Sequence, residues 1–286
     1  MADNIKTLLR LYRQYAKMDL LWFLRDTRYF LLQLVSDVVC AGCTIAGVYL
    51  LSVSFQNLSG MNRDEILFMM GYSVVIDGII MLFFLGNNTS MVSRIIGRGQ
   101  LDHILIQPVP LWAELLAQGF SPFSGSPMLL FGAALTWHGA EKASVFVTPV
   151  WIALFLLYAA CSSLIVLSFQ YLLSCTAFYA PAAAEEISMV GRDLFSTLKT
   201  YPLGNMNAGA KGIFLTAIPI GLVAWFPSHL LLQAGREGLS SLDLISVLYL
   251  PGASAVFLTA AILFFKKGMK YYARFGSPRY TGFGHR

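Results

Sequence analysis

The chain has 286 residues, of which 57% are hydrophobic and only 12% are charged, and its mean hydropathy is +0.65. A soluble globular domain is roughly half apolar and about a quarter charged, so this composition argues against a soluble protein. The net charge of +5 does not indicate a nucleic-acid partner, because Lys and Arg cluster at the two ends of the chain and form no patch interleaved with aromatic residues. The sequence therefore predicts an integral membrane protein.

The first 28 residues predict an amphipathic helix. They hold six basic and three acidic residues and no uninterrupted apolar core, which argues against a cleavable signal peptide. Helical spacing places Ile5, Leu8, Leu9, Tyr12, Ala16, Leu20 and Phe23 on one side, and Lys6, Arg10, Arg13 and Lys17 largely on the other. We expect the helix to lie in the cytoplasmic membrane interface, its basic side toward anionic lipid. The alternative is a soluble helix packed on a partner.

Six apolar stretches follow, and each is long enough to cross a bilayer, which takes about 20 residues of helix. None of them contains Lys or Arg. The third is interrupted in its middle by Ser121, Pro122, Ser124, Gly125, Ser126 and Pro127. The predicted spans are residues 31–53, 66–86, 113–137, 145–173, 212–232 and 244–265.

The basic residues orient these spans. Alternate segments outside the spans, beginning with the N-terminal one, carry 17 of the 20 Lys and Arg residues, and the other segments carry 3. By the positive-inside rule, both termini are predicted to be cytoplasmic, and five spans would break that rule. We expect one transmembrane domain over residues 1–286, with the amphipathic helix at 1–28, six spans within 29–265 and a basic tail at 266–286.

Two carboxylates lie well inside predicted spans, Asp37 in the first and Asp77 near the middle of the second. An isolated charge in hydrocarbon is costly, so each should face protein or water. They are candidates for the lining of a translocation path, and hydrogen-bonded packing residues are the alternative. Gly71 and Gly78, seven apart on the second span, predict a close approach to another helix.

The sequence contains no complete catalytic or metal-binding pattern. Cys40 and Cys43 have the spacing of a redox or metal pair but lie inside a span without a second pair. Gly204 and Gly209 have the separation of a phosphate-binding loop, yet Ala210 stands where that loop needs Lys. No His-Glu-x-x-His or Gly-x-Ser-x-Gly pattern is present. We therefore expect no metal site, no cofactor and no enzymatic activity in this chain.

The segment from Ser93 to Pro110 is the most informative loop. Gly97 and Gly99 loosen the chain where it leaves the second span, and Pro108 and Pro110 stop any helix that follows. Between them, residues 100–106 predict a short helix held beneath the membrane. Such an element could serve as a docking helix, or it could be a plain connecting loop.

At this loop the sequence resembles the transmembrane subunits of type 2 ATP-binding-cassette transporters, in particular their compact six-span bacterial branch. The resemblance rests on Arg98-Gly99-Gln100-Leu101-Asp102 and on Gln107-Pro108-Val109-Pro110. It extends over most of the chain, through the amphipathic helix, the six spans, Tyr201-Pro202-Leu203 and Trp225-Phe226-Pro227. It implies an all-α membrane protein of the type 2 exporter fold.

The resemblance implies a dimer with an identical or related permease in the bacterial cytoplasmic membrane, mounted on two cytoplasmic nucleotide-binding ATPase subunits that hold Mg-ATP. It also implies export of a hydrophobic or amphipathic small molecule, lipid-linked compound or peptide. Short re-entrant helices between the last two spans are a further implication, with Pro227 and residues 229–239 as the candidate segment. The implied coupling helix contacts the ATPase through Arg98, Gly99, Gln100, Leu101, Asp102, His103 and Ile104.

Other interpretations stay open on the sequence. A secondary carrier driven by an ion gradient could use Asp77 and the broken third span, although the two halves show no obvious repeat. A membrane enzyme or scaffold is weakened by the missing catalytic residues. The loop 175–210 predicts a solvated helix of mixed charge, with a second ATPase contact as the alternative. The identity of the cargo is not predicted.

Overall fold

A computed structural model describes residues 2–54, 60–84 and 92–276, and this part of the chain is helical without any β-strand. The last two residues of the predicted second span, 85–86, and positions 277–286 of the predicted tail lie outside the described residues. The helices are α1 (Ala2–Arg25), α2 (Thr27–Ser54), α3 (Arg63–Phe84), α4 (Val92–Gly97), α5 (Leu101–Leu105), α6 (Leu111–Ala117), α7 (Pro122–Lys142), α8 (Pro149–Ser174), α9 (Pro181–Leu198), α10 (Ala208–Thr216), α11 (Trp225–Glu237) and α12 (Leu244–Phe275), with short 3-10 helices η2 (Cys175–Phe178), η3 (Pro219–Leu222) and η4 (Leu239–Ser241).

Four described helices are long and apolar enough to cross a membrane, and they coincide with the predicted first, second, fourth and sixth spans. Their qualifying segments are Thr27–Gly47, Arg63–Phe84, Pro149–Phe178 and Leu244–Phe275. A bent pair, Ala208–Thr216 with Pro219–Glu237, forms a fifth candidate. The chain is therefore a multi-pass, all-helical membrane protein with four to five candidate spans in its described part. The predicted third span corresponds to α6 and α7, which do not meet the same test of length and apolar character.

The predicted fifth span is not the single helix expected over residues 212–232. It is broken between α10 and η3, and the two parts are bent by 68°. Pro219 opens η3, where its missing N–H and fixed backbone angle prevent α10 from continuing. The prediction placed a break at Pro227 instead. Pro227 lies in the first turn of α11, where backbone N–H groups have no partner inside the helix, so it interrupts nothing.

Polar side chains of α8 donate hydrogen bonds to the backbone of this broken segment. Ser162 donates a hydrogen bond of 3.1 Å to the Leu222 carbonyl oxygen, and Trp151 Nε1 donates one of 2.9 Å to that of Leu231. The hydroxyl of Tyr72 on α3 lies 3.1 Å from Ser162 Oγ and extends this network. Irregular backbone is tolerated in a membrane protein where protein groups replace water, and these buried contacts provide that replacement.

Helix α1 packs across the gap between α6 and α7. The Asp19 carboxylate accepts hydrogen bonds from the backbone N–H groups of Phe123 (2.7 Å) and Ser124 (3.1 Å), in the first turn of α7. It therefore caps α7, since the N-cap residue Ser121 donates its hydroxyl to α3 instead. Tyr15 of α1 donates a hydrogen bond to the Glu114 carboxylate of α6. Burial is the main cause that raises the pKa of Tyr15, and this hydrogen bond raises it further, so the phenol stays protonated as the donor.

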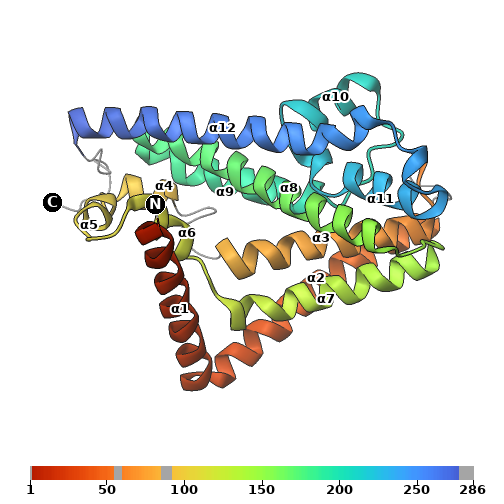
Figure 1. Cartoon of the computed structure of the whole chain (residues 1–286), viewed down its shortest axis with the longest axis horizontal. Coiled ribbons are helices and arrows are strands. Elements are labelled where there is room, and N and C mark those ends of the chain that lie inside the picture. The colour runs from red at the N-terminus through yellow and green to blue at the C-terminus, as the bar shows by residue number, and fades with distance from the viewer. Residues whose placement is uncertain (1, 55–59, 85–91, 277–286) are drawn as a thin grey trace.

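Helix α9 confirms that loop 175–210 forms a helix, but one side of that helix is packed and not solvated. It returns alongside α8, as Figure 1 shows, and buries Ala184, Ser188 and Phe195. The Phe195 ring lies 4.8 Å from that of Phe169 on α8, measured between ring centroids. The outer side of α9 exposes apolar residues such as Val190 as well as charged ones. The predicted helix is therefore present, and α8 is the packing partner that the prediction of full solvation did not include.

Glycines bring the backbones of α3 and α7 into direct contact along their length (Figure 1). A Cβ added to Gly71 or Gly78 of α3 would lie 2.5 Å from the Thr136 nitrogen or 2.4 Å from Leu129 Cα. On α7, Gly125, Gly132 and Gly139 recur every seven residues and meet the α3 backbone equally closely. The close approach predicted for Gly71 and Gly78 is confirmed, with α7 as the partner. Small residues at such a contact allow the dispersion attraction that holds helices together in lipid.

We expect Gly132→Leu to separate α3 from α7 and to destabilise the protein by about 3 kcal/mol, because an added Cβ alone would lie 2.6 Å from the Val75 backbone nitrogen. The thermal unfolding midpoint in a mild detergent measures this loss. Gly252→Leu on α12 is the matched control, since nothing lies within 4 Å of a Cβ there. Equal midpoints for the two variants would contradict the packing role of Gly132.

Candidate functional site

The chain leaves α4 through a glycine turn that sets the direction of α5. Gly99 has a φ of 70°, a left-handed conformation that residues with a Cβ adopt at a cost. Its N–H donates to Ile96 and that of Gln100 donates to Ile95, at 3.2 and 2.9 Å. This pair of bonds is the Schellman arrangement that closes a helix C-terminus. The short helix predicted at residues 100–106 is confirmed as Leu101–Leu105.

Helix α5 has one packed face and one open face. Leu101 and Ile104 are 1% and 8% exposed, and they lie in an apolar cluster with residues of α4, η2, α9 and α12 such as Phe178. Asp102 and His103 lie on the open side, and Ile106 just beyond the helix is 80% exposed. A five-residue helix is too short to be stable alone, so this cluster holds it in place.

Two polar contacts tie the α5 region to other helices. The hydroxyl of Tyr272, near the end of α12, donates a hydrogen bond of 2.7 Å to Asp102 Oδ1. Arg94 and Arg98 lie 3.2 and 3.7 Å from the two carboxylate oxygens of Glu185 at the start of α9. These arginines are partly exposed, so the ion pairs stabilise the fold modestly and serve mainly to position α9.

The predicted coupling residues fall into a buried group and an exposed group. Leu101 and Ile104 belong to the packed side, and Gly99 is buried in the turn. The exposed members are Arg98, Gln100, Asp102 and His103, of which Arg98 and Asp102 also have partners in this chain. Ile106, the last residue of the predicted coupling segment 100–106, lies just beyond α5 and is 80% exposed, so its large apolar side chain belongs to the open surface of this site.

Asp77 has a basic partner that sequence reasoning did not find. Its carboxylate forms an ion pair with Lys199, which follows directly after α9 and is only 8% exposed at its side chain. The charge distribution in the sequence places Lys199 in the cytoplasmic loop 175–210, whereas the return of α9 along α8 brings it to α3. A buried ammonium needs a partner of opposite charge, and Asp77 supplies it.

Asp37, the other candidate for a translocation path, has different surroundings. It accepts a hydrogen bond of 3.1 Å from Gln33 Nε2, one turn earlier on α2. The two predicted acids are therefore not joined in one site. Among the described residues, no group of three or more His, Cys, Asp or Glu side chains could hold a metal ion.

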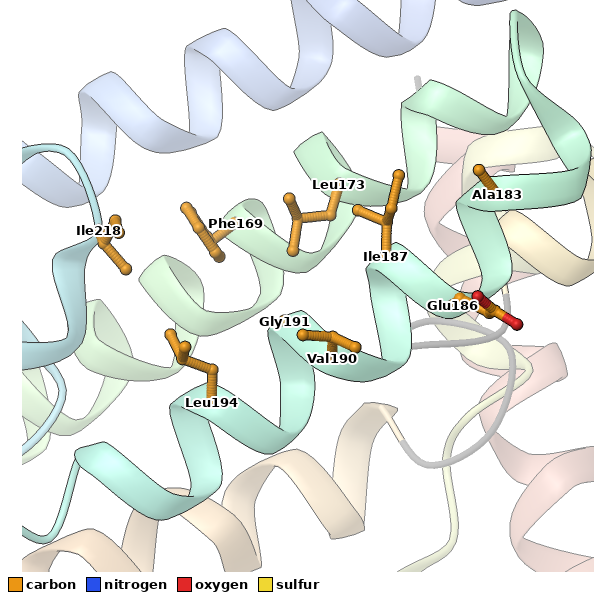
Figure 2. A pocket seen from close by; sticks show the side chains of 9 residues that line it. All are labelled: Phe169, Leu173, Ala183, Glu186, Ile187, Val190, Gly191, Leu194 and Ile218. Carbon is orange, nitrogen blue, oxygen red and sulfur yellow. The ribbon is translucent and has the colours of Figure 1, made fainter.

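An apolar groove of about 410 Å³ runs between α8 and α9 and is called the α8–α9 groove here. Its side chains lie between the two helices in Figure 2, with Glu186 toward the start of α9 and Ile218 at the other end. Sequence reasoning missed the groove, although the helical spacing of residues 187, 190 and 194 was its signal. Its lining is Phe169, Leu173, Ala183, Glu186, Ile187, Val190, Gly191, Leu194 and Ile218.

Removing either member of the Asp77–Lys199 pair should destabilise the protein, because the remaining charge loses its partner. We expect Asp77→Asn and Lys199→Met each to cost roughly 2 kcal/mol, and the double variant to cost clearly less than their sum. Thermal unfolding of the three variants in detergent measures this coupling. The exposed pair Arg192–Asp193, at 3.6 Å, is the control and should show almost no coupling. Additive effects at Asp77 and Lys199 would refute the pairing.

Comparisons with known proteins agree with this architecture. A search of curated proteins and a search of solved structures each found no significant match. The family model described as "ABC-2 family transporter protein" matches residues 38–276, which include α5, the α8–α9 groove and the broken fifth segment. In this family the membrane subunit works with separate nucleotide-binding subunits that hydrolyse ATP, so the chain itself is not the enzyme. The chain belongs to the ABC-2 family of transporter proteins, as a permease component.

Proposed function

We propose that this chain is the permease subunit of an ATP-driven exporter in a bacterial cytoplasmic membrane. Two such subunits, identical or related, stand on two cytoplasmic ATPase subunits, which bind Mg-ATP. The chain crosses the membrane six times, with α6 and α7 as the third crossing and α9 to α11 as a composite fifth. The observation that carries this proposal is α5, which is anchored by one face and open on the other.

The open face of α5 suits a protein partner. Leu105 and Ile106 expose large apolar side chains at 43% and 80%, next to the polar Asp102 and His103. Protein interfaces commonly combine an apolar centre with a polar rim, and a well-packed apolar residue there can dominate the binding energy. Ile106 is therefore the proposed centre of the ATPase contact.

The distribution of basic residues supports a cytoplasmic position for α5. Figure 1 shows α5 at the same end of the molecule as the last turns of α12, which carry Lys266, Lys267, Lys270 and Arg274. At this end α1 also runs across the direction of α3, α7, α8 and α12 (Figure 1), as a helix in the membrane interface would. By the positive-inside rule this end faces the cytoplasm, together with both termini.

The α8–α9 groove supports an apolar or amphipathic cargo, because nearly all of its lining is apolar and Glu186 is its one charged residue. The ion-gradient alternative loses its main support in this structure. It would use Asp77 and the broken third span as its ion site, and Asp77 is already paired with Lys199.

The proposal predicts that gentle detergent purification of the tagged chain yields a stoichiometric subunit with a Gly-x-x-x-x-Gly-Lys-Ser/Thr loop and ATPase activity. Ile106→Asp should weaken this association by about 2 kcal/mol, roughly 30-fold, because it places a charge at the centre of the contact. Phe146→Asp is the control, a similarly exposed apolar residue in the loop before α8. A lone chain that never associates with an ATPase would refute the proposal.

A second prediction concerns the transmission of ATPase closure to α12. Tyr272→Phe removes the bond to Asp102, so the change in hydrogen exchange of residues 263–275 on trapping Mg-ATP with vanadate should fall at least about threefold, while ATPase binding stays unchanged. Tyr271→Phe, at the neighbouring and more exposed ring, is the control. An exchange response equal to that of the unaltered protein would show that the bond transmits nothing.

A further inference from the structure

A cavity of about 340 Å³ lies at the elbow between α1 and α2 and has a different lining from the α8–α9 groove. We call it the elbow pocket and define it by Asp19, Trp22, Tyr29, Phe30 and Asp37. Its volume is in the range of ordinary small-molecule sites. Two carboxylates and three aromatic rings therefore line one cavity that no part of the proposed coupling mechanism uses.

The charges of the elbow pocket are not balanced within the described chain. None of the lining residues is basic, and the ion pairs of the described residues include neither Asp19 nor Asp37. Asp19 is engaged with three donors at the start of α7, whereas Asp37 accepts from the neutral amide of Gln33. A carboxylate in a largely apolar setting is stabilised by a cation, and Asp37 is the one placed to receive it.

The aromatic residues define the kind of cation. Trp22 and Tyr29 are 40% and 54% exposed, and their ring centroids lie 5.9 Å apart in a nearly perpendicular arrangement. Ring faces attract quaternary ammonium and similar organic cations, with Trp the strongest. A hard metal ion would instead require a shell of six or more oxygen ligands. The combination of rings and one available carboxylate fits an organic cation.

Apolar residues in and next to the pocket predict that its ligand also has an apolar part. Leu34 and Met81 line its wall. Leu31 and Val35, close by on α2, are 50% and 55% exposed and continue the apolar surface along that helix. We propose that the elbow pocket binds the charged group of an amphipathic organic cation, with Asp37 as counter-ion and Trp22 and Tyr29 as aromatic contacts. This binding goes beyond the proposed export function and requires no ATPase subunit.

The test measures binding of tetraphenylphosphonium to the full chain in an uncharged maltoside detergent by equilibrium dialysis. We expect one site per chain, and a clear preference over the neutral analogue triphenylphosphine oxide. Asp37→Asn should weaken binding of the cation about tenfold, and Trp22→Leu about fivefold. Asp37→Glu, which keeps the charge, should retain most of the affinity.

The controls separate this site from general adsorption. Asp193→Asn and Trp112→Leu alter an exposed carboxylate and an exposed indole outside the pocket, and both should bind as the unaltered chain does. A photoreactive quaternary ammonium probe should label residues 19–37 of the unaltered chain, a measurement that does not depend on whether any variant folds. Equal binding of the cation and its neutral analogue, equal binding by Asp37→Asn, or labelling confined to other helices would each overturn the proposal.

Discussion

The backbone contact between α3 and α7 is the constraint on which much of the remaining structure depends. Helix α7 is long but, unlike α2, α3, α8 and α12, is not apolar enough to qualify as a candidate span, so the membrane alone does not determine its position. The glycines at 71, 78, 125, 132 and 139 let it lie directly against α3, where dispersion forces and close packing hold it. Because Asp19 of α1 caps α7, the N-terminal helix and the elbow pocket take their positions from the same contact.

Polar groups inside the bundle compensate for elements that are not regular apolar helices. At the bend near Pro219, Ser162 of α8 donates a hydrogen bond to the Leu222 carbonyl oxygen, and Trp151 donates a further one to the Leu231 carbonyl oxygen within α11. The short return of α9 ends at a lysine, and Asp77 neutralises it. In each case a helix of regular composition, α8 or α3, carries the compensating side chain. The irregular segments thus depend on the regular helices for hydrogen-bond donors and for a partner of opposite charge.

Composition, apolar runs and charge bias were sufficient to predict α2, α3, α8 and α12, because a helix in lipid must be apolar over about 20 residues. They could not locate the bend, since Pro219 and Pro227 are equally strong breakers in sequence, and only the position of Pro227 in a first turn makes it harmless. They assigned Lys199 to the cytoplasm, because a charge tally gives every Lys equal weight and cannot detect a partner 122 residues away. The short helix α5 was predicted from its glycines and prolines, but the division of its residues between two faces depends on tertiary packing.

Because α5 has one packed face and one open face, a partner bound to the open face could act through the packed face on the membrane part of the protein. Helix α5 has no stability of its own, so a force on its open face is resisted by the cluster beneath it. Close-packed side chains transmit displacement rather than absorb it, and the cluster joins α4, η2, α9 and α12. The bonds from Asp102 to Tyr272 and from Arg98 to Glu185 connect the same helices from the polar side. Since α9 also forms one wall of the α8–α9 groove, the proposed coupling predicts that a displacement of α5 would change the shape of that groove.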